Sequence, residues 1–337
     1  MRKISLGLIA ALLAITACEN EIEVIEADNS PVIILNGLID ASSHTHHVHL
    51  SEGRGKRVTS LYGAKVRCYV NGEYVSDGTT DNYNNVLSAP YLFEADLKTG
   101  DVLRIETDKG VWAEAIVPKA PVVTKVDTEV IDPAGFEDEG SIKFRISFND
   151  IPGKESFYMA DIESSKTRSF QGYAEDETDF SGHYLESDND PLLNEGRSED
   201  GENVIDDLIG ILFGRNEYNI FSDNTFADGS YTLRTKVSYW YLRDALLTYK
   251  PSGYPYDYAY SESTARLKVF GLDKTTFRYI KSVNASWTLG SYLITTPVIL
   301  PTNVNGGLGY LGAMNPGVAE VTFPRRMVPI YEDLYTY

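Results

Sequence analysis

The chain has 337 residues and a formal net charge of −19, with 42% hydrophobic and 23% charged residues. At roughly 100–200 residues per domain, this length predicts two domains, and the hydrophobic fraction excludes an intrinsically disordered chain. So acidic a composition argues against nucleic acid as a partner, because phosphate binding needs clustered Lys and Arg.

Residues 1–17 are typical of a bacterial signal peptide. A basic pair precedes an apolar run from Ile4 to Ile15, which is shorter than the ~20 residues that span a bilayer. The run ends in Ile15-Thr16-Ala17-Cys18, which resembles a lipoprotein box, where the cysteine thiol accepts a diacylglycerol. Cys18 is therefore the predicted lipidation site, with the lipid as the membrane anchor. The alternative is a soluble secreted protein in which Cys18 merely follows the cleavage site.

Residues 18–30 form an acidic tether that begins Cys18-Glu19-Asn20-Glu21-Ile22-Glu23. Acidic residues directly behind a lipidated cysteine resemble the surface-export signal of Bacteroidetes lipoproteins, which favours an outer-membrane protein facing the cell exterior. A polar, solvated tether without an export function is the alternative. The other cysteine, Cys68, then has no partner in the chain and is expected to be a small buried residue of a strand.

Residues 31–118 predict an immunoglobulin-like antiparallel β-sandwich. An apolar run stops at Asn36-Gly37, and the alternating segment from Ala64 to Val70 turns at Asn71-Gly72, the strongest hairpin signal in the chain. Further short strands are expected at Leu92–Leu97, Val102–Glu106 and Trp112–Val117, with no helix between them.

Residues 119–337 predict a larger β-rich domain with one or two short helices, reached through the linker Pro118-Lys119-Ala120-Pro121. Strands are expected at Val122–Val130, Ser141–Asn149, Phe157–Glu163, Tyr231–Tyr241, Leu267–Phe270 and Ala319–Phe323. Residues 171–204 indicate a long acidic loop, and residues 305–312, with four glycines, a tight backbone crossing. Helices are expected at Val204–Phe213 and from Lys274 to about Ser286, the second capped by Asp273 with an apolar stripe of Phe277, Ile280, Val283 and Trp287.

Four of the five histidines lie within six residues, at His44, His46, His47 and His49. On an extended strand His47 and His49 share one face, and His44 and His46 share the other. Two such imidazoles could hold Zn²⁺ or Cu²⁺ with one or two further ligands, such as Glu52. An exposed polar turn leading into a strand is the alternative.

The segment Tyr254-Pro255-Tyr256-Asp257-Tyr258-Ala259-Tyr260 places four tyrosines in strict alternation. If it is extended, Tyr254, Tyr256, Tyr258 and Tyr260 share one face that suits contact with a ligand or partner. Packing against the body of the same domain is the alternative.

The sequence provides little for catalysis or for further metal sites. Acidic clusters at 175–179 and 186–190 could bind Ca²⁺, but Pro191 stands where an EF-hand loop needs glycine, so a solvated loop is favoured. No GxSxG, HExxH or Cys–His motif is present, and His183 stands alone in the acidic loop. We therefore expect neither an enzyme nor a bound cofactor.

Several fragments together resemble a family of Bacteroidetes outer-membrane lipoproteins known only as a domain of unknown function. The matching fragments are Leu35-Asn36-Gly37-Leu38-Ile39-Asp40, Val48-His49-Leu50-Ser51, Gly63-Ala64-Lys65-Val66 with Asn71-Gly72, Val117-Pro118-Lys119-Ala120-Pro121, Asp188-Asn189-Asp190-Pro191-Leu192, Phe221-Ser222-Asp223, Tyr231 and Asn303-Val304-Asn305-Gly306-Gly307-Leu308-Gly309. The genes of this family commonly lie beside TonB-dependent receptors, so the resemblance implies an accessory or ligand-capture subunit of such an importer. A structural or adhesive surface protein without a transport role is the alternative.

Overall fold

The computed structural model describes residues 30–55, 57–81, 89–132, 140–153, 155–170, 176–177, 179–194, 216–242, 258–290 and 300–329. Within these ranges the protein is mainly β, as the sequence predicted, and its largest sheet curls into a half-barrel. No helix in the described ranges is long and apolar enough to cross a membrane. The signal peptide, Cys18, the acidic tether and the predicted helix Val204–Phe213 lie outside the described residues.

The first unit packs two sheets against each other. One face comes from β1 (Val32–Asp40), β2 (Thr45–Arg54), β3 (Arg57–Ser60) and β6 (Ala89–Glu94) of the ten-stranded sheet. The other is a five-stranded sheet of β4 (Lys65–Val70), β5 (Glu73–Thr79), β7 (Val102–Thr107), β8 (Trp112–Ile116) and β18 (Val304–Asn305). Alternating apolar side chains from both sheets form its core, in which the thiol of Cys68 is buried and free.

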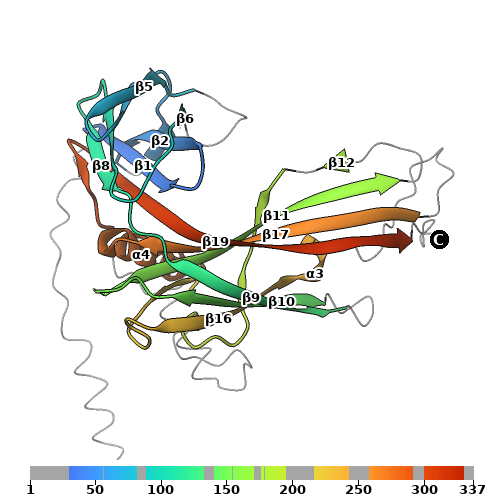
Figure 1. The fold of residues 1–337 in the computed structure, drawn as a ribbon. Coiled ribbons are helices and arrows are strands. Elements are labelled where there is room, and N and C mark those ends of the chain that lie inside the picture. The colour runs from blue at the N-terminus through green and yellow to red at the C-terminus, as the bar shows by residue number, and fades with distance from the viewer. Residues whose placement is uncertain are drawn as a thin grey trace, which may run out of the picture.

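The second unit is built on three long strands of the ten-stranded sheet: β11 (Phe157–Phe170), β17 (Tyr258–Leu272) and β19 (Leu308–Pro329), which run side by side in Figure 1. The short strands β12 (Asp176–Glu177), β13 (Ser181–His183) and β15 (Ile220–Ser222) pair with β11. A four-stranded sheet of β9 (Val122–Ile131), β10 (Ser141–Asn149), β16 (Ser230–Ser238) and β14 (Glu186–Ser187) lies against them. The core between the two sheets is rich in aromatic side chains.

Two helices accompany the described strands. The four-residue α3 (Tyr239–Leu242) follows β16 directly, so the predicted strand Tyr231–Tyr241 is wrong at its end. The longer α4 (Lys274–Gly290) confirms the predicted helix and runs past Ser286. As expected, the carboxylate of Asp273 caps it by accepting hydrogen bonds from the backbone N–H groups of Thr275 and Thr276, at 2.7 and 3.0 Å.

Strand β19 is the largest departure from the sequence prediction, because it begins at Leu308 rather than at Ala319. Its first residues pair in parallel with β1, and its later residues pair with β17, so one strand joins the two units. The expected close crossing near the glycines is present: Gly309 has φ +105°, and a Cβ there would stand 2.1 Å from the carbonyl oxygen of Leu35. Glycine is needed at this position both for its φ and for the space.

The described residues of the acidic segment 171–204 include short strands rather than forming only the expected long loop. Its described part contains β12, β13 and β14, because polar strands can pair at the edge of a sheet whose other members supply the core. The linker 118–121 has no regular structure, but it packs closely against the long strands. Asn315 on β19 donates a hydrogen bond to the carbonyl oxygen of Pro118. On β17, a Cβ on Gly271 would lie 2.1 Å from the carbonyl oxygen of Lys119.

Candidate functional site

The face of the ten-stranded sheet that is turned away from both cores carries a groove. Along β1, the side chains of Leu35 and Ile39 are buried in the first core, whereas those of Asn36, Leu38 and Asp40 point the other way. Neighbouring strands contribute to the same face in register, with His47 and His49 from β2, Tyr310 from β19, Lys268 from β17 and Met159 from β11. The groove consists of two adjoining cavities that share the side chains of Leu38 and His47.

The first cavity, of about 300 Å³, is predominantly apolar and aromatic, and α4 forms one of its walls. It is lined by Asn36, Gly37, Leu38, His47, His49, Met159, Tyr218, Tyr279, Ile280, Val283 and Tyr310. The rings of Tyr279 and Tyr310 stack at a centroid distance of 4.5 Å, and those of His47 and His49 meet edge to face at 4.9 Å. Burial lowers the pKa of His49, which therefore remains neutral at pH 7.

Hydrogen bonds fix the aromatic wall of this cavity. The side-chain carbonyl of Asn36 accepts a hydrogen bond from the backbone N–H of Tyr310, at 3.0 Å. The hydroxyl groups of Tyr310 and Thr276, in the first turn of α4, lie 3.1 Å apart. Strand β1, strand β19 and α4 are thus linked at this point, so the stacked rings stand on fixed backbone.

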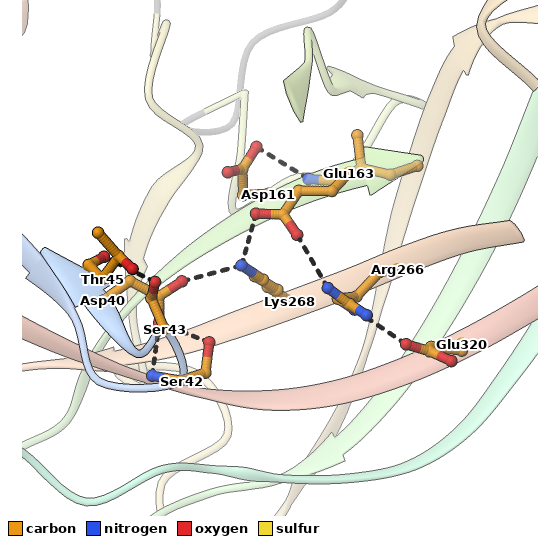
Figure 2. Close-up of polar contacts among 10 residues, drawn as sticks. Asp40, Ser42, Ser43, Thr45, Asp161, Glu163, Arg266, Lys268 and Glu320 are labelled. Atoms are coloured by element: carbon orange, nitrogen blue, oxygen red, sulfur yellow. Dashed lines mark hydrogen bonds and ion pairs between the residues drawn. The ribbon is translucent and has the colours of Figure 1, made fainter. Parts of the chain in front are cut away.

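The second cavity, of about 280 Å³, is polar and contains an ion-pair network (Figure 2). The ammonium group of Lys268 donates to Asp40 at 2.8 Å and to Glu163 at 2.6 Å. The guanidinium of Arg266 lies 2.9 Å from Glu320 and 3.6 Å from Glu163. The Lys268 side chain is 7% exposed. Burial by itself lowers the pKa of Lys268, but the hydrogen bonds to Asp40 and Glu163 outweigh it and raise that pKa.

Asp161 lies beside this network without a cation bound to it (Figure 2). Among the described residues, its carboxylate accepts a hydrogen bond only from the backbone N–H of Ile162, at 2.8 Å. Burial, with a smaller contribution from the negative charge of Glu163, raises the pKa of Asp161 to about 6. A carboxylate kept from water and only partly compensated is a common feature of binding sites.

A family model for a domain of unknown function, DUF4249, matches residues 19–319. The chain belongs to this family. No curated protein matches this DUF4249 chain. The match includes every residue that lines the groove and starts directly after Cys18.

In this DUF4249 protein the four clustered histidines do not converge on one point. As predicted for an extended strand, His47 and His49 share the face of β2 that lines the groove, whereas His46 is buried on the other face and bonds the carbonyl oxygen of Ala95 at 2.9 Å. His44 is exposed, and its ring lies 2.8 Å from the carboxylate of Asp96, whose hydrogen bond raises the pKa of His44. Within the described residues, no three side chains of His, Cys, Asp or Glu are arranged to hold a metal ion.

The tyrosine segment is described only in part. Tyr254 and Tyr256 lie outside the described residues, and Tyr258 and Tyr260 stand in the first residues of β17, where the backbone pairs with β19. The contact role assigned to these tyrosines stays a prediction. Of the acidic clusters, 175–179 is described only in part; in 186–190, Asp188 forms an ion pair with Lys143, and Asp190 is fully buried.

The sequence analysis placed His183 alone in an acidic loop, but in the structure this histidine has two side-chain partners. Its ring nitrogen lies 2.6 Å from the hydroxyl of Ser164, and its ring stacks on Tyr241 at 4.5 Å. The side chain of Ser164 is buried, and that of His183 is half-buried beside it.

The groove residues outside the histidine cluster were missed by sequence reasoning. One signal was present: the segment Leu35–Asp40, already noted as a family-like fragment, supplies Asn36, Leu38 and Asp40 to the groove. The alternation of Arg266 and Lys268 with the apolar Ala265, Leu267 and Val269 was a second, weaker signal. Tyr279 and Tyr310 had none, because stacking between a helix and a distant strand is a tertiary contact.

Proposed function

We propose that this protein is a lipid-anchored outer-membrane protein that faces the cell exterior and captures a small ligand for a TonB-dependent receptor. The observation that carries the capture role is the groove, in which an aromatic cavity adjoins a cavity lined by charged side chains. Binding sites for small molecules have this composition, with apolar side chains that give contact area and a few placed polar groups. The anchor rests on the sequence around Cys18, and the receptor on the neighbourhood of related genes.

We also propose that the first unit is an immunoglobulin-like sandwich, since two sheets face each other across an aliphatic core. A binding rather than a catalytic role is proposed for the whole protein. In support, Ser164 is buried, and neither Ser164 nor His183 lines either of these two cavities.

A structural or adhesive role is the second candidate, and one observation favours it. Strand β9 ends its four-stranded sheet and exposes Val122, Val130 and Ile131. Exposed apolar side chains along a strand at the end of a sheet suit contact with another protein.

Purification of the tagged protein from gently solubilised outer membranes tests the proposal. The capture role predicts a β-barrel receptor in stoichiometric amount, and the adhesive role predicts the lipoprotein without it. The Cys18→Ala variant is the matched control, because loss of the only predicted acylation site should release the protein from the membrane fraction. Recovery of the wild-type protein without a receptor would contradict the importer role, and unchanged membrane association of Cys18→Ala would contradict the lipid anchor.

Surface display has its own test. Replacement of the acidic residues in 19–23 by alanine should protect the protein from a protease added to intact cells. Equal cleavage of both forms would leave those residues as a plain tether.

A further inference from the structure

Asp161 lies on β11 between Met159 and Glu163, which each line one of the two cavities of the groove. On β11 the side chains of Ala160 and Ile162 are buried in the second core, so those of Met159, Asp161 and Glu163 occupy the opposite face, which carries the groove. Met159 lines the aromatic cavity, and Glu163 lines the polar one. Side chains two residues apart on a strand are separated by about 6.6 Å, so the carboxylate of Asp161 lies a short distance from the space beside the tyrosines.

The fixed cations of the groove are already paired with carboxylates. Lys268 contacts Asp40 and Glu163, and Arg266 contacts Glu163 and Glu320. With Asp161, which lies beside this network, the region holds four carboxylates and two cations. The charged residues that line the polar cavity balance, two against two, and the neighbouring carboxylates of Asp161 and Glu320 make its surroundings net negative, which disfavours an anionic ligand.

We propose that the groove binds a small organic amine, with its apolar ring in the cavity of Tyr279 and its ammonium group at Asp161. This inference rests on the proposed capture function and names its ligand class. The ring would meet the stacked tyrosines and the thioether of Met159, both favourable surfaces for an aromatic group. The ammonium group would donate to the Asp161 oxygens not engaged by the backbone, and charge-assisted bonds of this kind are the stronger ones.

The pH dependence of binding follows from the groups that face the amine. Asp40, Glu163, Lys268 and Arg266 line the polar cavity at its ammonium end, beside Asp161, and His47 and His49 line the aromatic cavity that would hold its ring. The raised pKa of Asp161 means that this carboxylate gains a proton, and so loses its negative charge, as the pH falls through about 6. Amine affinity should therefore decrease as the pH falls from 7.5 to 5.

Calorimetry and saturation-transfer NMR with matched probes test the proposal. Tryptamine carries an indole ring and an ammonium group, and indole-3-propionate carries the same ring with a carboxylate. Phenylalanyl-glycinamide presents the same amine chemistry as a peptide terminus. The full chain should bind tryptamine more tightly than indole-3-propionate, and tighter binding of the peptide amide would assign the amine to a peptide source.

Three variants locate the site. Asp161→Asn should weaken tryptamine binding about tenfold, the size of one charge-assisted hydrogen bond, and should leave indole-3-propionate unchanged. Tyr279→Leu should weaken both indole probes, whereas Glu129→Gln, on the exposed face of β9, should change neither. Melting temperatures establish that each variant is folded.

Equal or tighter binding of indole-3-propionate, or unchanged tryptamine binding by folded Asp161→Asn, would overturn the amine inference. Its failure is distinguishable from failure of the proposed function. If the protein co-purifies with a receptor but does not bind amines, the amine inference is wrong and the importer role is retained. If the protein binds amines but no receptor co-purifies, the importer role is wrong and the amine inference is retained.

Discussion

The two hydrophobic cores of this protein differ in side-chain composition and in how their buried polar groups are bonded. The first is mainly aliphatic, and its buried polar groups are few, with His46 and Thr80 bonded to nearby backbone. The second is aromatic, and buried carboxylates hold the loops around it: Asp150 accepts a hydrogen bond from the hydroxyl of Tyr158, and Asp190 accepts one from that of Tyr231. Buried aliphatic side chains need no hydrogen-bond partners, whereas the hydroxyl groups of buried tyrosines do.

This difference suggests that the second unit depends on a few specific side chains, whereas the first tolerates more change. The reason is that an alternating aliphatic core can relax around a substitution, while a ring held by several other rings leaves a cavity of fixed shape. The predictions below test this contrast in order of expected effect.

The largest effect is expected for Phe148→Ala. Its ring contacts four other aromatic rings in the second core, those of Tyr158, Phe221, Phe226 and Tyr231, at centroid distances of 5.4–6.5 Å. The variant should lose about 4 kcal/mol of unfolding free energy, measured by chemical denaturation. Ile105→Val in the first core should lose about 1 kcal/mol. Equal losses at the two sites would contradict the contrast between the cores.

Asp190→Ala should follow, with a loss of about 3 kcal/mol, because several donors lose their acceptor inside the protein. The fully buried carboxylate accepts hydrogen bonds from the backbone N–H groups of Leu192 and Arg234, both at 2.9 Å, and from Tyr231. Glu186→Ala, in the same segment but exposed, is the control and should stay within about 0.5 kcal/mol. Thermal and denaturant unfolding measure both, and a loss confined to Glu186→Ala would refute the role of Asp190.

Gly309→Ala tests the strand that joins the units. The new methyl group would meet the backbone of Leu35 at a positive φ, so a loss of about 2 kcal/mol is expected. Gly63→Ala separates the two causes, because Gly63 has φ +70° with nothing within 4 Å of its Cβ. That variant should lose about 1 kcal/mol, from backbone strain alone. Equal melting temperatures of the two variants would show that the close approach of β19 to β1 costs nothing.

The smallest effect has the opposite sign. Burial raises the pKa of Asp161 to about 6 in the folded protein, so the ionised carboxylate destabilises the fold above that pH. Asp161→Asn should therefore stabilise the protein at pH 7.5, by about 1 kcal/mol after allowance for solvent screening. The gain should shrink as the pH falls from about 6 to about 4, since the wild-type carboxyl is then neutral. Melting curves at pH 7.5 and pH 4.5 measure it, and a gain that grows in acid would contradict the cause.

The sequence was sufficient to predict features that depend on near neighbours along the chain. The alternation of Ile142, Phe144 and Ile146 predicted β10, Asn71-Gly72 predicted the β4–β5 turn, and Asp273 predicted the start of α4. The shared face of His47 and His49 followed from the same two-residue period.

The sequence by itself therefore determined the mainly β class, the local turns and caps, and the burial of Cys68, because strand alternation and turn chemistry act over a few residues. Only the tertiary structure decided that β19 runs from Leu308 to Pro329, that Asp40 reaches Lys268, and that Tyr279 stacks on Tyr310. These contacts join residues far apart in the chain, such as Asp40 and Lys268. No local pattern encodes them, because they arise from the curl of one sheet shared by both units.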